Sequence, residues 1–260
     1  MDKSVRVIIN ADDFGDCVET NKAIADAFDQ KLITSTTIMA NRPGFEDAIR
    51  IAHEKKLTNK IGIHINLTLG HPLTDKIKRY SKFCDKDGMF LRRNKNPIKV
   101  FMPLNYDEKK ALFHEVKEQI KLCRINGIPL THADSHNHKH EEWNIIDVLI
   151  NTLKEEKMHR IRISRNIGLK NNLFNRLYRN ILNNKLNKHF KTSEYFGSID
   201  DVKEFHRISN TKKFSYFEIM CHPKLDTKLN IVDNNIELQK KVKFLNDNLK
   251  YTPISYNDLH

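Results

Sequence analysis

The sequence predicts an α/β fold, an incomplete (β/α) barrel of seven parallel strands. Short apolar runs alternate with stretches of helical periodicity along the 260 residues, which is the pattern of βα units around a mostly parallel sheet. The length suits one such domain, spanning residues 1–260, and no internal repeat divides it. An open doubly wound sheet is the alternative, because the two folds differ in strand order, which a sequence does not show.

The individual elements follow from apolar periodicity. Seven short runs are expected to be strands, and they are residues 5–10, 33–40, 61–69, 129–136, 161–164, 217–221 and 254–256. Helices are expected where apolar residues recur every three or four positions, in residues 21–30, 44–56, 106–126, 141–157 and 234–248.

Two long stretches lack a clear period and are expected to be insertions. Residues 71–104 are rich in Pro, Asp, Lys and Gly, so we expect a loop that carries a small hairpin. Residues 166–213 are rich in Asn, Lys and Arg with scattered Leu and Phe, so we expect a peripheral helical insertion.

The chain is basic, with 45 Lys and Arg against 33 Asp and Glu and a formal net charge of +12. Such an excess permits binding to nucleic acid or another anionic surface. Here the excess is spread along the chain, and no basic run is interleaved with aromatic residues as in proteins that bind single strands. We therefore expect no nucleic-acid partner.

Segment lengths and cysteine spacing exclude further classes. No apolar run approaches the roughly 18 residues that a membrane-spanning helix needs, and the opening MDKSVRVIIN lacks the pattern of a secretory signal. The four cysteines form no CxxC pair, so neither a disulfide framework nor a zinc ribbon is expected. We expect a cytoplasmic protein without a membrane partner.

Two adjacent carboxylates, Asp12 and Asp13, come directly after the first strand. The carboxyl ends of parallel strands hold the functional sites of α/β folds. Two buried carboxylates would repel each other, and a divalent cation relieves that cost. Because neighbouring side chains point in different directions, one Asp can bind a metal while the other handles a proton. The structural alternative is that one caps the next helix and the other is solvated.

Histidines also lie on two further expected strands. Alternation places His64 on the same face as Gly62 and Asn66, opposite the isoleucines of that strand. The strongest signal comes at the end of the fourth strand, where nine residues contain His132, Asp134, His136, His138 and His140. Imidazole and carboxylate ligands suit Zn, Mn, Fe or Mg. Four histidines cannot all bind one ion, so some must orient the ligands or contact substrate.

His222 follows the sixth strand and precedes Pro223, which fixes the chain as it leaves the strand. This position suits a general acid or base. Alternation points Cys221 away from His222, so we expect Cys221 to be buried packing and not a nucleophile.

Together these residues predict a mononuclear metal hydrolase, in which an aspartate removes a proton from water and a histidine returns one to the leaving group. GxSxG, P-loop and GxGxxG motifs are absent. Two alternatives stay open. A metal-dependent phosphoesterase would favour two metals and a basic phosphate-holding loop. A non-catalytic basic protein would bind acidic glycan or nucleic acid with strong salt dependence.

In these motifs the chain resembles the YdjC/ChbG-like carbohydrate deacetylases. The matching stretches occur in the family's order, and they are INADDFG at 9–15, TSTT at 34–37, IGIH at 61–64, PLTHADSHNHKH at 129–140 and EIMCHP at 218–223. The two insertions match poorly, and they are where substrate choice would be built. Asp16 stands where many family members have Leu.

The resemblance implies a barrel related to the polysaccharide deacetylases and hydrolysis of an N-acetyl group on an amino sugar or chito-oligosaccharide. It also implies a homodimer and a divalent metal, usually Mg²⁺. Carried over by position, the metal ligands are Asp13, His64 and His136. Asp12 is then the catalytic base and His222 the proton donor. Zn²⁺ and Mn²⁺ are the alternative metals, since two His and one Asp are also a zinc set. Arg162, in the fifth strand, is expected to hold a carboxylate or the substrate.

Overall fold

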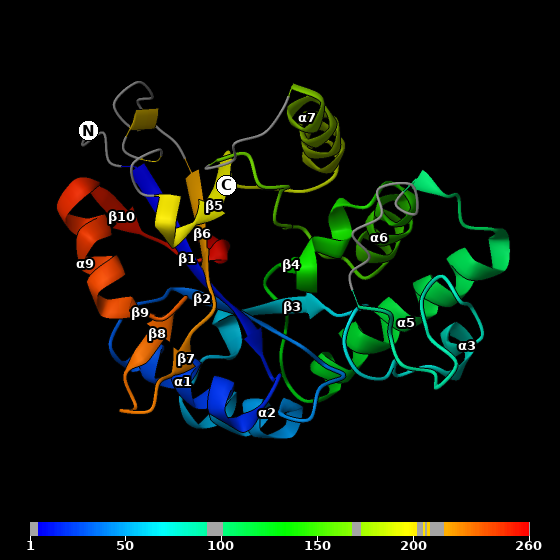
Figure 1. Cartoon of the computed structure of the whole chain (residues 1–260), viewed down its shortest axis with the longest axis horizontal. Helices are drawn as coiled ribbons and strands as arrows, with labels where there is room; N and C mark the ends of the chain where they lie inside the picture. The colour runs from blue at the N-terminus through cyan, green and yellow to red at the C-terminus, as the bar shows by residue number, and fades with distance from the viewer. Residues whose placement is uncertain are drawn as a thin grey trace.

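The computed structural model describes residues 5–92, 101–167, 173–201, 205, 207–208 and 216–259. At its centre lies a curled, open parallel sheet that forms a half-barrel, with helices packed around its outside (Figure 1). Within the described residues, no helix has the length and apolar character needed to cross a membrane.

The strands of the main sheet are all parallel to their neighbours. In the described part of the chain, one hydrogen-bonded path runs β4-β3-β2-β1-β6-β5, and β10 pairs with the start of β1 beside this path. The bounds are β1 Val5–Phe14, β2 Ser35–Ile38, β3 Ile61–Ile65, β4 Ala133–Ser135, β5 Tyr195–Ser198, β6 Tyr216–Cys221 and β10 Tyr251–Pro253. A small antiparallel sheet follows β6 and consists of β7 Lys224–Leu225, β8 Ile231–Asp233 and β9 Ile236–Glu237.

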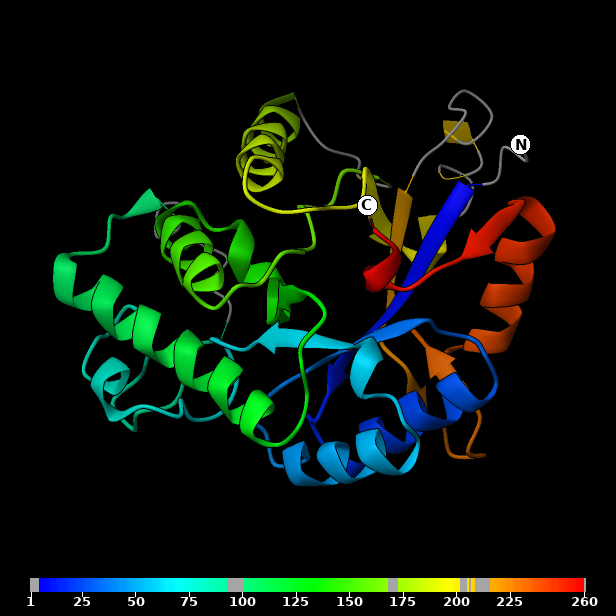
Figure 2. The ribbon, with the colours of Figure 1, turned by 180° about the vertical axis from the view of Figure 1, so that it is seen from behind.

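The helices cover the convex side of the sheet, as the two opposite views show (Figures 1 and 2). Helices α5 and α6 lie beside β3 and β4, α1 and α2 lie beneath β1 and β2, and α9 lies beside β10. The α-helices are α1 Val18–Asp29, α2 Phe45–Glu54, α3 Asp75–Lys78, α5 Tyr106–Ile125, α6 Trp143–Glu155, α7 Leu173–Asn187 and α9 Leu238–Asn248. Short 3₁₀ turns are η1 Thr58–Lys60, η2 His136–Glu141, η3 Ile199–Asp201 and η4 Tyr256–Asp258.

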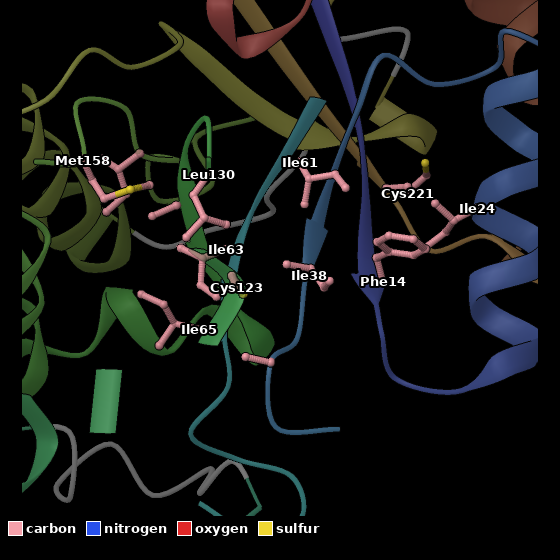
Figure 3. Close-up of a cluster of buried hydrophobic side chains, with 14 of the residues drawn as sticks. Phe14, Ile24, Ile38, Ile61, Ile63, Ile65, Cys123, Leu130, Met158 and Cys221 are labelled. Carbon is pink, nitrogen blue, oxygen red and sulfur yellow. The ribbon is translucent and has the colours of Figure 1, made fainter. Parts of the chain in front are cut away.

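The hydrophobic core lies between the convex side of the sheet and these helices. Figure 3 shows Ile61, Ile63 and Ile65 of β3 in this cluster, with Phe14 of β1 against Ile24 of α1. Burying each such side chain stabilises the fold by about 1.5–3 kcal/mol. The alternate positions of the same strands carry polar side chains, so period-two alternation leaves the concave face of the sheet polar.

One position on that concave face is closely packed. Gly62 of β3 lies against the imidazole of His132, and a Cβ at this position would come within 2.6 Å of that ring. Glycine is therefore required here by the close approach of a neighbouring side chain.

The expected incomplete (β/α) barrel is confirmed as an open half-barrel, but its strands are not the seven that the sequence predicted. Residues 161–164 make isolated bridges and not a strand, because Ile161 N–H bonds to Lys191 O while Arg162 N–H bonds to Ala133 O. Within the described residues, no strand pairing joins β4 directly to β5, so the sheet stays open at this side.

The two insertions were predicted with mixed success. The second contains helix α7, as expected, but it also supplies β5, which joins the main sheet beside β6. In the first, α3 is followed by an antiparallel bridge between Cys84 and Phe90. Residues 93–100, 168–172, 202–204, 206 and 209–215 of these regions lie outside the described residues.

Other boundaries moved by a few residues. Strand β3 ends at Ile65 and not at residue 69, and the last strand is β10, three residues earlier than expected. Residues 234–237, expected to begin the last helix, instead form the turn and strand of the β8–β9 hairpin. Asn234 and Asn235 both have positive φ, which suits a tight hairpin turn.

Candidate active site

The carboxyl end of β1 is irregular, and the irregularity brings two adjacent carboxylates to one site. The register of β1 against β2 shifts between Ala11 and Phe14, and Asp13 has a left-handed φ of 70°. In a regular strand, Asp12 and Asp13 would lie on opposite faces of the sheet. Instead, Asp12 contacts Arg162, Asp13 lies beside His64, and Phe14 is buried in the core. The conformation of Asp13 costs on the order of 1 kcal/mol, and such strain is typical of functional sites.

Arg162 is fully buried and holds carboxylates from three strands. Its guanidinium donates Nη1 to Asp12 Oδ2 and Nη2 to Asp12 Oδ1, both at 2.7 Å. Nε donates to Glu218 Oε1 at 2.6 Å, and Nη1 also lies 2.7 Å from Asp134 Oδ2. Of the two expected roles for Arg162, these contacts match the holding of carboxylates.

The Arg162 contacts decide the charge of Asp12. Burial alone would raise the pKa of Asp12, but the guanidinium outweighs burial and holds this pKa well below its ordinary value. Asn10 Nδ2 also donates to Asp12 Oδ1 at 2.9 Å. Asp12 is therefore an ionised carboxylate whose orientation is fixed from two sides.

His64 is buried between two carboxylates. Its Nδ1 lies 2.6 Å from Asp134 Oδ1, and its Nε2 lies 3.2 Å from Asp13 Oδ1. Burial lowers the pKa of His64, but Asp134 and Asp13 outweigh burial and raise it to about 10. The carboxylates of Asp134 and Asp13 therefore favour positive charge on the groups beside them.

His136 approaches Asp13 from the other side. Its Nε2 lies 3.8 Å from Asp13 Oδ1, and its Nδ1 forms a 2.8 Å hydrogen bond with Thr68 Oγ1. Burial and the nearby His64 lower the pKa of His136, which favours the neutral imidazole that binds metals. Thr68 fixes the ring as the outer partners of metal-binding histidines do.

A nitrogen atom of each of these two imidazoles therefore lies near the same oxygen of Asp13. Asp13 Oδ1 is buried and accepts no hydrogen bond of good geometry from the described residues. With the ring protons of His64 and His136 on Nδ1, both Nε2 lone pairs face this oxygen, and a cation stabilises such an arrangement. One carboxylate and two imidazoles form a known ligand set for Zn²⁺ and for Fe²⁺, and carboxylate ligation also suits Mg²⁺ or Mn²⁺. The residues present fit a divalent metal.

A second group of potential donors overlaps the first. Atoms of Asp12, His64 and Asp134 lie within 4.8 Å of one another, and all three residues are buried. Both oxygens of Asp12 already accept hydrogen bonds from Arg162, while Asp134 bonds to Nδ1 of His64. Asp13 Oδ1, in contrast, accepts no hydrogen bond of good geometry from the described residues.

His222 lies at the end of β6, across from Asp12. Its Nε2 is 3.9 Å from Asp12 Oδ2, and 41% of its side chain is exposed. An imidazole that is close to the buried carboxylate and also open to solvent can reach a bound substrate. Cys221 points into the hydrophobic core, where burial raises the pKa of its thiol, as expected for a packing residue.

The other three histidines of the cluster lie around the donor atoms. His132 is buried, and its ring stacks on Tyr256 with 3.5 Å between the ring centroids. Its Nε2 lies 3.2 Å from Asn10 Oδ1. His140 Nδ1 bonds to Ser135 Oγ at 2.6 Å. His138 Nδ1 lies 3.6 Å from Glu141 Oε1.

Sequence reasoning missed Glu218, Asn10 and Thr68. Glu218 had a usable signal, because alternation along β6 places it on the same face as His222. Burial raises the pKa of Glu218 to about 7 although Arg162 opposes this. Thr68 follows β3 and carried no comparable signal.

Comparison with known proteins identifies relatives over nearly the whole chain. The family model described as YdjC-like protein matches residues 6–249. A carbohydrate deacetylase of Vibrio parahaemolyticus is 27% identical over 251 residues, which are 92% of this chain and 86% of that protein. A carbohydrate deacetylase of Clostridium beijerinckii is 30% identical over 227 residues, 86% of this chain and 84% of that protein.

A solved structure matches the fold. It comes from Enterococcus faecalis V583 and is provisionally described as a cellobiose-phosphate cleavage protein. It superposes with a TM-score of 0.75 at 20% identity and covers 98% of this chain and 99% of that chain. At this identity the likeness concerns the fold alone.

Proposed function

Because the chain belongs to the YdjC-like protein family, as its motifs predicted, we propose that it is a metal-dependent carbohydrate deacetylase. The substrate is an amino sugar or chito-oligosaccharide with an N-acetyl group. Its curated relatives named carbohydrate deacetylase support this activity. The observation that carries the metal dependence is Oδ1 of Asp13, which accepts no hydrogen bond of good geometry and lies near nitrogens of two imidazoles.

Asp13, His64 and His136 are the proposed metal ligands. When bound, a divalent cation polarises the acetyl carbonyl and lowers the pKa of a water molecule. Mg²⁺ is the proposed metal from the family resemblance, with Zn²⁺ or Mn²⁺ as the alternatives. Asp134 and Thr68 keep the two imidazoles oriented through their Nδ1 atoms.

Asp12 and His222 are the proposed proton-transfer pair. Asp12, held ionised by Arg162, accepts the proton of the attacking water. A bond forms between the water oxygen and the acetyl carbon, and the bond from that carbon to the sugar nitrogen then breaks. His222 gives a proton to the departing nitrogen, so acetate and a free amino sugar result.

The test measures acetate released from N-acetylglucosamine oligomers. Protein treated with a chelator should be inactive and should recover activity with one added metal. Asp12→Asn and His222→Ala should each lower kcat by about 10²–10⁴, the usual contribution of a general base or acid. His136→Ala should weaken metal binding, measured by calorimetry.

His189→Ala is the matched control, because His189 is exposed beyond the end of α7 and far from the site residues in the sequence. It should leave activity and metal binding unchanged. One bound ion per chain without acetate release from any oligomer would retain the metal site and contradict the chito-oligosaccharide substrate.

We also propose a homodimer, which the family resemblance implies, and a cytoplasmic location, which the four cysteines without a CxxC pair favour. Light scattering on purified protein should give twice the chain mass of 30.6 kDa. A mass of one chain would contradict the dimer.

A further inference from the structure

The small sheet of β7, β8 and β9 folds back onto His222, the residue that directly follows β6. The chain passes from His222 through Pro223 into β7 and returns in β8, where Val232 lies opposite Lys224. The antiparallel return brings Asp233, the last residue of β8, beside His222. Asp233 Oδ1 accepts a 2.8 Å hydrogen bond from the backbone N–H of His222.

Asp233 is itself held by a buried cation. It is 2% exposed, and its Oδ2 lies 2.7 Å from Nζ of Lys241, which is 7% exposed and comes from α9. Lys241 Nζ also lies 2.7 Å from Oδ1 of the half-exposed Asp200, just after β5. Both oxygens of Asp233 are therefore engaged, one by the backbone of His222 and one by a lysine on a separate helix.

The imidazole ring of His222, unlike the carboxylate of Asp233, is not held by hydrogen bonds from the described residues. The described residues include no hydrogen-bond partner for this ring, and its ion-pair neighbour, Asp12, is 3.9 Å away. The ring is instead placed by its backbone, which is fixed by three contacts. They are the pairing of the preceding residue, Cys221, with Ala11 of β1, the fixed φ of the following Pro223, and the hydrogen bond to Asp233.

We propose that Asp233 is a positioning residue of the active site, which with Lys241 fixes the backbone of His222 and so sets where its imidazole stands relative to Asp12. This proposal rests on the proposed role of His222. A buried ion pair adds little net stability compared with apolar packing of the same size. Its value here is geometric, since a displacement of about 1 Å at a reacting group can cost roughly a hundredfold in rate.

The test separates the hydrogen bond from the ion pair. Asp233→Ala removes both, and it should lower kcat by about tenfold to a hundredfold with KM and metal affinity within about twofold. The double variant D233N/K241M removes both charges but keeps an amide oxygen that accepts the His222 N–H. It should recover most of the lost kcat, and it keeps the test valid if Asp233→Ala does not fold.

Asp226→Ala is the matched control. Asp226 lies in the turn between β7 and β8 of the same small sheet, where it accepts hydrogen bonds from the backbone of Lys228 and Asn230. It contacts neither His222 nor Lys241 in the described structure, so its loss should lower the melting temperature while kcat stays unchanged. If Asp233→Ala behaves like Asp226→Ala, Asp233 only stabilises the sheet and the proposal is wrong. A double variant that loses as much kcat as Asp233→Ala would also overturn it.

A second measurement does not depend on turnover. Hydrogen exchange of the His222 amide, followed by NMR, should accelerate at least tenfold in Asp233→Ala and stay unchanged in Asp226→Ala. If the wild-type protein deacetylates no sugar, the proposed function fails, and this exchange rate still decides whether Asp233 holds the His222 backbone. An unchanged rate would overturn the positioning role.

Discussion

At the scale of residues, similar side chains acquire different roles from their immediate surroundings. Asp12 and Asp13 are neighbours in the sequence. Asp12 is ionised and paired with Arg162, whereas Oδ1 of Asp13 accepts no hydrogen bond of good geometry. The same holds for histidines: His64 lies between two carboxylates, whereas His140 has only a hydroxyl at its Nδ1. The two carboxylates raise the pKa of His64, whereas burial lowers the pKa of His140.

The neutral state of His140 predicts a pH dependence of stability. Burial, helped by the positive charge of Arg162, lowers its pKa to about 3 in the folded protein, against about 6.5 in an unfolded chain. The unfolded state therefore binds the extra proton as the pH falls below about 6.5, and stability is lost progressively down to the folded pKa. Urea unfolding at pH 7.5 and pH 5 should show wild type losing about 2 kcal/mol more than His140→Asn. Equal losses in the two proteins would show that His140 is protonated in the folded state.

At the scale of elements, helices were easier to predict than strands. The periodicity of residues 106–126 predicted α5 closely, because the helical spacing of apolar residues in an amphipathic helix is visible in its own sequence. Strand β5, with the sequence YFGS, is stabilised by pairing with β6 and has little pattern of its own. The β8–β9 hairpin was missed because two Asn residues at its turn resemble a loop before a helix.

The start of α5 gives a test at this scale. Asn105 Oδ1 accepts a hydrogen bond from Glu108 N, and Glu108 Oε2 accepts one from Asn105 N, which forms a capping box. Asn105→Ala should lower the free energy of unfolding by about 1 kcal/mol, measured with urea. Asn180→Ala, on the exposed face of α7, is the control and should change stability by less than about 0.5 kcal/mol. An Asn105 variant as stable as the control would show that the box contributes nothing.

At the scale of the whole molecule, the curled sheet separates an apolar convex side from a polar concave side. Helices bury the convex side (Figure 3), and the concave side gathers charged groups from β1, β3, β4 and β6. Burying so many charges is costly unless they are paired, and Arg162 supplies the pairing. Metal binding should add to this pairing and stabilise the folded chain.

This coupling predicts a metal-dependent melting temperature. A metal at about one hundred times its dissociation constant should stabilise the fold by about 2.7 kcal/mol, which corresponds to roughly 5–10 °C. Thermal unfolding of chelated protein with and without added metal measures the shift. His136→Ala should lose most of it, and His189→Ala should keep it. A shift of the same size in both variants would place the metal elsewhere.

The sequence by itself determined most of the long helices, the alternation of apolar and polar residues in the strands, the family motifs and the residues that carry them. These features are local, because each depends on residues within a few positions of one another. Only the tertiary structure decided that the sheet stays open, that β5 joins it, and that Arg162 binds Asp12 across 150 positions of sequence. The tertiary structure also decided which atoms of the motif residues, such as Oδ1 of Asp13, accept no hydrogen bond of good geometry. The distances between these side chains depend on strand register and on backbone irregularities such as the one at Asp13. The order of residues alone does not reveal either.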